Sequence, residues 1–174
     1  MRKKICRFFV VFLFSSILAA KYEIEMQSFK ILPELTNIDY IDPGTLRMKQ
    51  EGRNNFAISG SMSIKRSFGS NDKVKMTYER KLPNDRFIKM YIGSYVGCEM
   101  MKQDIYKKVT EKSNLPYPPV CPFPPGNYTI DNLNIDESFY PSVLPTGESR
   151  ITLETMQDNV PVYGIQIVTN IKAV

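Results

Sequence analysis

Alternation of apolar and polar residues runs through most of the chain and constrains its fold more than any other feature. In residues 73–80, Val74, Met76 and Tyr78 alternate with Lys73, Lys75 and Thr77. Successive side chains of a strand point to opposite faces, so this pattern predicts a strand with one buried face. The same period recurs in residues 21–26, 56–65, 86–93, 127–135, 150–155 and 163–171. The chain is therefore predicted to be mostly β, an antiparallel β-sandwich or β-cup.

One segment departs from this period and favours a helix. Apolar residues recur near helical spacing at Cys98, Met101, Ile105 and Val109. This spacing predicts one short helix from about Tyr95 to Thr110. The helix leads into a stretch, residues 116–125, that holds six of the chain's 12 prolines. Proline lacks the backbone N–H, so this stretch is not expected to join a sheet by a hydrogen-bond ladder.

The first twenty residues are predicted to be a secretory signal peptide. Arg2, Lys3 and Lys4 precede an apolar run from Phe8, and the segment ends in small residues at Ala20. The apolar run of about 13 residues is shorter than the roughly 20 that a membrane-spanning helix needs, which weakens the alternative of an anchor. Residues 21–174 are then expected to form a single secreted domain.

Removal of this segment changes what the charge implies. The whole chain has 23 Lys and Arg against 18 Asp and Glu, a net charge of +5. Four of the basic residues and none of the acids lie in residues 1–20, so the remainder carries 19 against 18, or +1. Nucleic acid is therefore not predicted as a partner.

Export also bears on the cysteines. Cys6 leaves with the signal peptide, so Cys98 and Cys121 remain. In an oxidising compartment this pair predicts one disulfide, with two buried free thiols as the alternative. Such a bridge would tie the proline-rich stretch to the predicted helix. A sequon follows at Asn127, and alternation directs Asn127 to the face opposite Tyr128, towards solvent, where it is a candidate for glycosylation.

Three stretches in roughly the last 60 residues carry a family resemblance. "CPFPPGNYTI" from Cys121 resembles the cysteine-proline segment of the ganglioside-activator proteins, members of the ML lipid-recognition superfamily. "YPSVLPTGESRITLE" from Tyr140 resembles their strand-entry loop, and "YGIQIVTNIKAV" from Tyr163 their last strand. The chain is also similar to the insect secreted CheB-type chemosensory proteins. It departs from the activators in having one available cysteine pair, and in Val143, which stands where they have a mouth-loop tryptophan.

The resemblance implies an immunoglobulin-like β-sandwich or cup with an apolar cavity that binds a lipid or small hydrophobic ligand. The loop between Pro141 and Pro145 is the candidate mouth, where exposed apolar side chains would contact ligand. The candidate ligand-binding residues are Phe139, Tyr140, Val143 and Leu144 in this mouth, and Phe56, Met62, Met76, Tyr78 and Met90 on strands. The alternative for the strand residues is that they fill a solid core.

Catalysis is not expected from this sequence. The chain has no histidine, which removes His-based triads and His metal sites. No nucleophile elbow, phosphate-binding loop or cysteine cluster is present either, so neither a cofactor nor a metal is predicted.

Three functions stay open at this level. The first is a secreted carrier, related to chemosensation or pheromones, for a lipid or hydrophobic small molecule. The second is an activator that presents a lipid to a separate hydrolase. The third is an extracellular interaction module with a filled core. Beyond the ligand, a membrane surface or a receptor is the expected partner, and the protein is expected to be a monomer.

Overall fold

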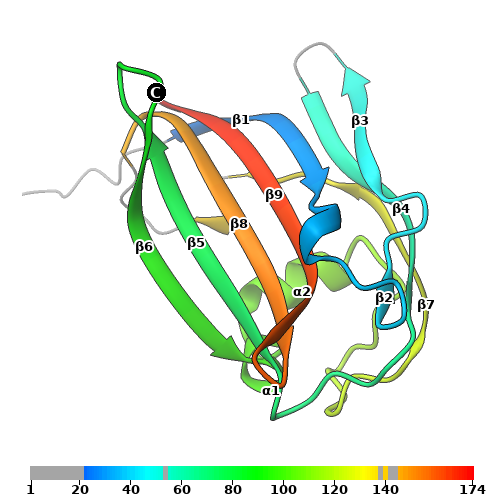
Figure 1. The fold of residues 1–174 in the computed structure, drawn as a ribbon. Coiled ribbons are helices and arrows are strands. Elements are labelled where there is room, and N and C mark those ends of the chain that lie inside the picture. Colours follow the sequence, from blue (N-terminus) through cyan, green and yellow to red (C-terminus); the bar gives the residue numbers. More distant parts are fainter. Residues whose placement is uncertain (1–21, 53–54, 137–138, 141–144) are drawn as a thin grey trace, which may run out of the picture.

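Two antiparallel sheets enclose the core (Figure 1). The computed structural model describes residues 22–52, 55–136, 139–140 and 145–174. Within them the prediction of a mostly-β sandwich or cup is confirmed. The segment interpreted as a signal peptide, residues 1–20, lies outside the described residues.

The first sheet brings the two ends of the described chain together. Its five strands are, in order across the sheet, β1 (Tyr22–Ile31), β9 (Val160–Ala173), β8 (Gly147–Gln157), β5 (Lys73–Lys81) and β6 (Phe87–Val96). The pairing of Met76 with Leu153, and of Tyr78 with Ile151, keeps the alternating apolar residues of β5 and β8 on one face. That shared face is the one the alternation predicts to be buried.

The second sheet is built around β4 (Asn55–Ile64). Strand β7 (Gly126–Leu133) pairs with one edge of β4, while β3 (Arg47–Gly52) and then β2 (Ile41–Asp42) pair with the other. A short 3-10 helix, η1 (Pro33–Leu35), lies between β1 and β2. Alternation did not predict β2 or β3, because β3 is largely polar and mostly exposed, with β4 supplying its pairing.

Apolar side chains from both sheets meet in one core cluster. Its buried members are Met26, Leu46, Ile58, Leu133 and Ile167. Fully burying a side chain of this size stabilises a fold by roughly 1.5–3 kcal/mol before the cost in conformational entropy. A second buried cluster lies beneath the helical segment and consists of Met101, Tyr106, Phe123 and Tyr128. The candidate site lies between the sheets, next to this second cluster.

The single helix predicted from about Tyr95 to Thr110 is wrong in its extent. Strand β6 continues to Val96 because Tyr95 and Val96 pair with β5. Two short helices follow, α1 (Gly97–Met100) and α2 (Asp104–Thr110). The break between them allows both Met101 and Tyr106 to be buried in the second cluster. Strand pairing and burial therefore override the helical spacing of this segment.

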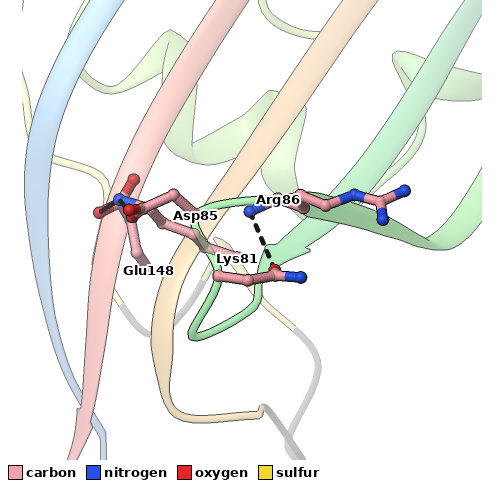
Figure 2. A network of polar contacts seen from close by, with 5 residues as sticks. Lys81, Asp85, Arg86 and Glu148 are labelled. Atoms are coloured by element: carbon pink, nitrogen blue, oxygen red, sulfur yellow. Dashed lines mark hydrogen bonds and ion pairs between the residues drawn. The ribbon is translucent and has the colours of Figure 1, made fainter.

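A polar network fastens the β5–β6 hairpin to β8 (Figure 2). The Nζ of Lys81 lies 3.2 Å from Asp85 Oδ1 in the hairpin turn and 3.2 Å from Glu148 Oε2 at the start of β8. Hydrogen bonds to these two carboxylates raise the pKa of Lys81. In the same turn, the backbone N–H of Arg86 donates to Asn84 Oδ1 over 3.3 Å. These ion pairs connect the hairpin turn to the start of β8, and exposed pairs of this kind contribute little stability.

Candidate ligand-binding pocket

A pocket of about 310 Å³ lies between the two sheets, next to the helices and the proline-rich stretch. Small-molecule sites in proteins have volumes of roughly 300–1,000 Å³, so this pocket is at the small end of the range. Most of the side chains in its wall are aliphatic, aromatic or methionine. The wall therefore favours an apolar occupant.

Three neighbouring strands of the first sheet form one side of the pocket. Val74 on β5 pairs with Thr155 on β8, and Thr155 pairs with Tyr163 on β9. Directly paired residues share a face of the sheet, so these three side chains form one row. Leu153 lies two residues from Thr155 on β8 and faces the same way. All four residues line the pocket.

The second sheet and the helical segment form the other sides. Met62 and Ile64 come from β4, and Met101 and Tyr106 from the second buried cluster. Ile105 on α2 also lines the pocket, and 41% of its surface is exposed. The pocket therefore borders solvent beside α2.

The proline-rich stretch contributes Phe123 to the wall and is held in place by the predicted disulfide. Cys98 and Cys121 are bridged, with their Cα atoms 5.7 Å apart, which confirms the pairing. The bridge is not the sole attachment of this stretch, although the lack of backbone donors had suggested so. Phe68 and Phe123 exchange two backbone hydrogen bonds, of 3.1 and 2.6 Å.

Two tyrosine hydroxyls add further attachments of this stretch. Tyr106 donates to the carbonyl of Pro116 over 2.9 Å, and Tyr128 donates to that of Pro124 over 2.8 Å. Prolines keep their carbonyl acceptors although they lack N–H donors, so side-chain donors replace the missing ladder. Asn127 is exposed while Tyr128 is buried, as the alternation predicts.

Among the described residues that line the pocket, Arg66 is the one cation, and it is already engaged. The guanidinium carbon of Arg66 lies 4.1 Å from the centre of the Tyr40 ring. Arg66 Nη1 also donates to the Tyr40 hydroxyl over 3.0 Å. Arg66 is exposed, so this pair belongs to the rim of the pocket and not to its depth.

Tyr163 is, like Tyr106, a buried polar side chain of the pocket wall. Only 7% of its surface is exposed, and its buried hydroxyl has no hydrogen-bond partner among the described residues. Burial raises the pKa of Tyr163, because the charged phenolate loses its hydration. The side chain is therefore a neutral hydrogen-bond donor at physiological pH.

The strand residues singled out from the sequence have different positions. Met62 lines the pocket. Phe56 packs instead against the first core cluster. Met76 and Tyr78 are partly buried and lie on the inner face of β5, but they are not among the residues that line the pocket. The alternation thus predicted the correct face for these residues, but it did not predict which of them border the cavity.

The expectation that Met90 lines the interior is wrong, because half of its surface is exposed. Tyr78 pairs with Tyr91 and Glu79 with Lys89, which leaves Met90 as the extra residue of a β-bulge. Strand β6 is also the edge of its sheet, and Ile88, Met90 and Tyr91 are 40%, 50% and 48% exposed. Apolar residues that alternate along an edge strand can therefore stay exposed, because no neighbouring element has to cover them.

Of the predicted mouth, Phe139 and Tyr140 are described by the structure, and neither lines this pocket. Phe139 packs against the first core cluster. The Tyr140 hydroxyl lies 3.1 Å from Thr169 Oγ1, and burial raises the pKa of Tyr140 to about 12. Thr169 is six residues from Tyr163 along β9, which corresponds to about 20 Å of strand. Val143 and Leu144 lie outside the described residues.

Replacing Phe139 with serine is expected to destabilise the protein by about 1–3 kcal/mol, since the change removes apolar contacts with the core. Urea denaturation of the purified variant measures this loss. Ile38→Ser is the matched control and should change stability little, because Ile38 is 61% exposed. Unchanged stability of the Phe139 variant would contradict the core placement and favour the mouth predicted from the sequence.

Several residues of the pocket were not selected as site residues from the sequence. The alternation predicts that Val74, and Leu153 within residues 150–155, face inward, but it does not identify them as cavity residues. Tyr163 has alternating neighbours like any other strand residue, and Phe123 lies in a stretch without periodicity. One signal in the sequence could have located this part of the pocket. Aromatic residues such as Phe123 and Tyr128 lie in or next to the proline-rich stretch, which indicates that the stretch packs against the body of the protein.

Metal ligation and membrane crossing are two further properties that bear on function. Within the described ranges, no three His, Cys, Asp or Glu side chains are grouped so that they could hold a metal ion. None of the helices in the described part of the chain is both long and apolar enough to span a membrane.

Comparison with known proteins locates a family match in the middle of the chain. Residues 73–151 match DUF1091. This family is described as a protein of unknown function, and it is of the ML lipid-recognition type. No curated protein matches the chain.

The DUF1091 match covers one part of the pocket. It begins with β5 and includes α1, α2, the bridged cysteines, the proline-rich stretch and β7. Leu153, Thr155 and Tyr163 lie beyond its end, and Met62 lies before its start. The match spans less than half of the 174 residues, so the remaining walls of the pocket come from outside it.

Proposed function

We propose that this chain is a secreted, non-catalytic binding protein that holds a lipid or small hydrophobic ligand between its sheets. The observation that carries the proposal is the pocket of about 310 Å³ with its mainly apolar wall. A solid core would place Val74, Leu153 and Met62 in contact with other side chains instead of around a cavity. Small-molecule sites have this combination of an apolar wall and a few polar groups.

Two further observations support the same function. The wall formed by the proline-rich stretch is attached by a disulfide and by backbone and tyrosine hydrogen bonds, so the pocket is preformed. A preformed site loses less conformational entropy when it binds. The match to a family of the ML lipid-recognition type is consistent with an apolar ligand.

In this proposal the protein acts by equilibrium binding alone. The absence of histidine removes the usual base at neutral pH. The signal peptide predicted at residues 1–20 directs the chain out of the cell. The similarity to CheB-type proteins favours a carrier role in chemosensation or pheromone transport, with a receptor or membrane as the second partner.

The edge strand β6 favours one alternative. Its exposed apolar residues Ile88, Met90 and Tyr91 form a surface suited to contact with a membrane or another protein. An activator that presents a lipid to a separate hydrolase needs such a surface. This second function shares the pocket with the first and differs in the fate of the bound lipid, which is handed to an enzyme.

Binding of a fluorescent fatty acid to protein stripped of lipid tests the proposed function. We expect saturable binding that unlabelled oleic acid displaces. Binding that does not saturate, or no binding, would contradict the proposal and favour an interaction module without a ligand. Stimulation of a lysosomal lipid hydrolase by the loaded protein would then distinguish the activator from the carrier.

A further inference from the structure

Arg66 and Arg150 are stacked on aromatic rings in the same way, but they differ in their anionic partners. The guanidinium carbon of each lies 4.1 Å from a ring centre, that of Tyr40 for Arg66 and that of Phe87 for Arg150. Arg150 also donates from Nε to Glu79 Oε2 over 2.7 Å. Among the described residues, no carboxylate forms an ion pair with Arg66. An anion at Arg66 would therefore have to come from outside the described part of the chain.

The guanidinium of Arg66 is held in position while most of its donors stay available. The ring of Tyr40 supports one face, and Nη1 donates to the Tyr40 hydroxyl over 3.0 Å. A guanidinium carries five N–H donors in a planar fork, so the bond to Tyr40 leaves enough of them for an oxyanion. Arg66 is exposed, so a ligand can reach it from solvent. The group is thus both oriented and accessible.

Arg66 gives the rim of the pocket a positive charge that the wall does not balance. Asp and Glu are absent from the described residues that line the pocket, and most of these residues are apolar. One guanidinium balances the single charge of a carboxylate, whereas a phosphate monoester carries about −1.5 to −2 at pH 7. A carboxylate can also accept two parallel hydrogen bonds from the planar fork. The rim therefore suits a ligand with a carboxylate head.

The volume of the pocket restricts the apolar part of such a ligand. A methylene group is close in size to a water molecule, which takes up about 30 Å³ in the liquid. The pocket of about 310 Å³ therefore has room for roughly ten groups of this size. One aliphatic chain of medium length fills that space, whereas the two long chains of a membrane lipid exceed it.

We propose that the pocket binds a carboxylic acid with a single medium-length aliphatic chain, whose carboxylate lies at Arg66 and whose chain lies between the sheets. This inference rests on the proposed function, since it assumes that the pocket binds an apolar molecule. It adds the class of ligand and the residue that orients it. The guanidinium selects the anionic head, and the apolar wall, which includes Val74 and Leu153, receives the chain.

The test compares Arg66→Gln with the wild type for decanoate and 1-decanol, which have chains of equal length and differ in the charge of the head group. Each ligand displaces the neutral fluorescent reporter N-phenyl-1-naphthylamine from protein stripped of lipid at neutral pH, and each titration gives a Kd. We expect Arg66→Gln to weaken decanoate binding about tenfold, the low end for a charge-assisted hydrogen bond, because the site is exposed. The Kd of 1-decanol should stay nearly constant.

Lys65→Gln is the matched control. It removes the same charge from the neighbouring residue, which is exposed and does not line the pocket. Both of its Kd values should stay close to those of the wild type, and a thermal melt checks that each variant is folded. The inference would be wrong if decanoate affinity were unchanged in Arg66→Gln or fell equally in both variants; binding of 1-decanol would then leave the proposed function standing. If neither the reporter nor either ligand bound to the wild type, the proposed function would fail as well.

Discussion

Replacing Leu153 with tryptophan is expected to weaken binding of an apolar ligand at least tenfold while the protein stays folded. Leu153 lies on the inner face of β8 and lines the pocket, so the indole extends into the volume that a ligand would occupy. Extra atoms in a close-packed core cost about 1–3 kcal/mol through strain. Beside a pocket of about 310 Å³ that strain is largely avoided.

The tryptophan at position 153 both fills part of the pocket and provides a fluorescence signal. The wild-type chain contains no Trp, so emission from residue 153 reports its own surroundings. Titration with the fluorescent fatty acid measures the affinity, and a thermal melt measures the fold. Ile38→Trp is the control, with a side chain 61% exposed in the wild type. Wild-type affinity in a folded Leu153→Trp protein would mean that the ligand binds elsewhere.

Removing the disulfide is expected to cost about 3 kcal/mol of folding free energy in the chain-entropy model. The bridge closes a loop with a sequence separation of 23 and lies behind the wall that contains Phe123. The suitable variant combines Cys98→Ala with Cys121→Ser, because Cys98 packs against the second cluster and Cys121 is exposed. The melting temperature should fall by roughly 6–12 °C for a protein of this size.

Ligand affinity should fall in the same variant, since the wall of the pocket loses one of its attachments. Guanidinium denaturation with and without dithiothreitol provides the comparison. The reductant should bring the wild type to the stability of the double variant and leave the variant unchanged. If the oxidised wild type and the variant were equally stable, the prediction would be wrong. The backbone hydrogen bonds between Phe68 and Phe123 and the tyrosine hydrogen bonds would then be enough to hold the proline-rich stretch in place.

The sequence predicts the faces of the sheets better than the pocket. Alternation placed Val74, Met76 and Tyr78 on the inner face, because the direction of a side chain in a strand is a local property. The location of the cavity depends on where the two sheets and the helices diverge, and this is set by contacts between distant residues. Met62 and Phe56 alternate in the same strand, yet one lines the pocket and the other packs in the core.

The remaining differences have the same physical origin. Phe139 and Tyr140 lie in an apolar stretch close to two prolines, which is typical of an exposed loop, but both side chains contact the sandwich. Met90 has the spacing of a buried residue and is exposed by a bulge at the sheet edge. The unpaired hydroxyl of Tyr163 is a tertiary property, since it depends on which acceptors the described neighbouring elements bring within reach.

The place of β9 in the first sheet has a consequence for how the protein is made. Strand β9 lies between β1 and β8, so β1 has no partner in its sheet until β9 is available. A polypeptide is synthesised from its N-terminus at about 5–20 residues per second, so β1 emerges from the ribosome seconds before β9. During that interval the apolar face of β1 has to be shielded by other means. Completion of this sheet therefore has to wait until β9 has been synthesised, after the other four strands of the sheet.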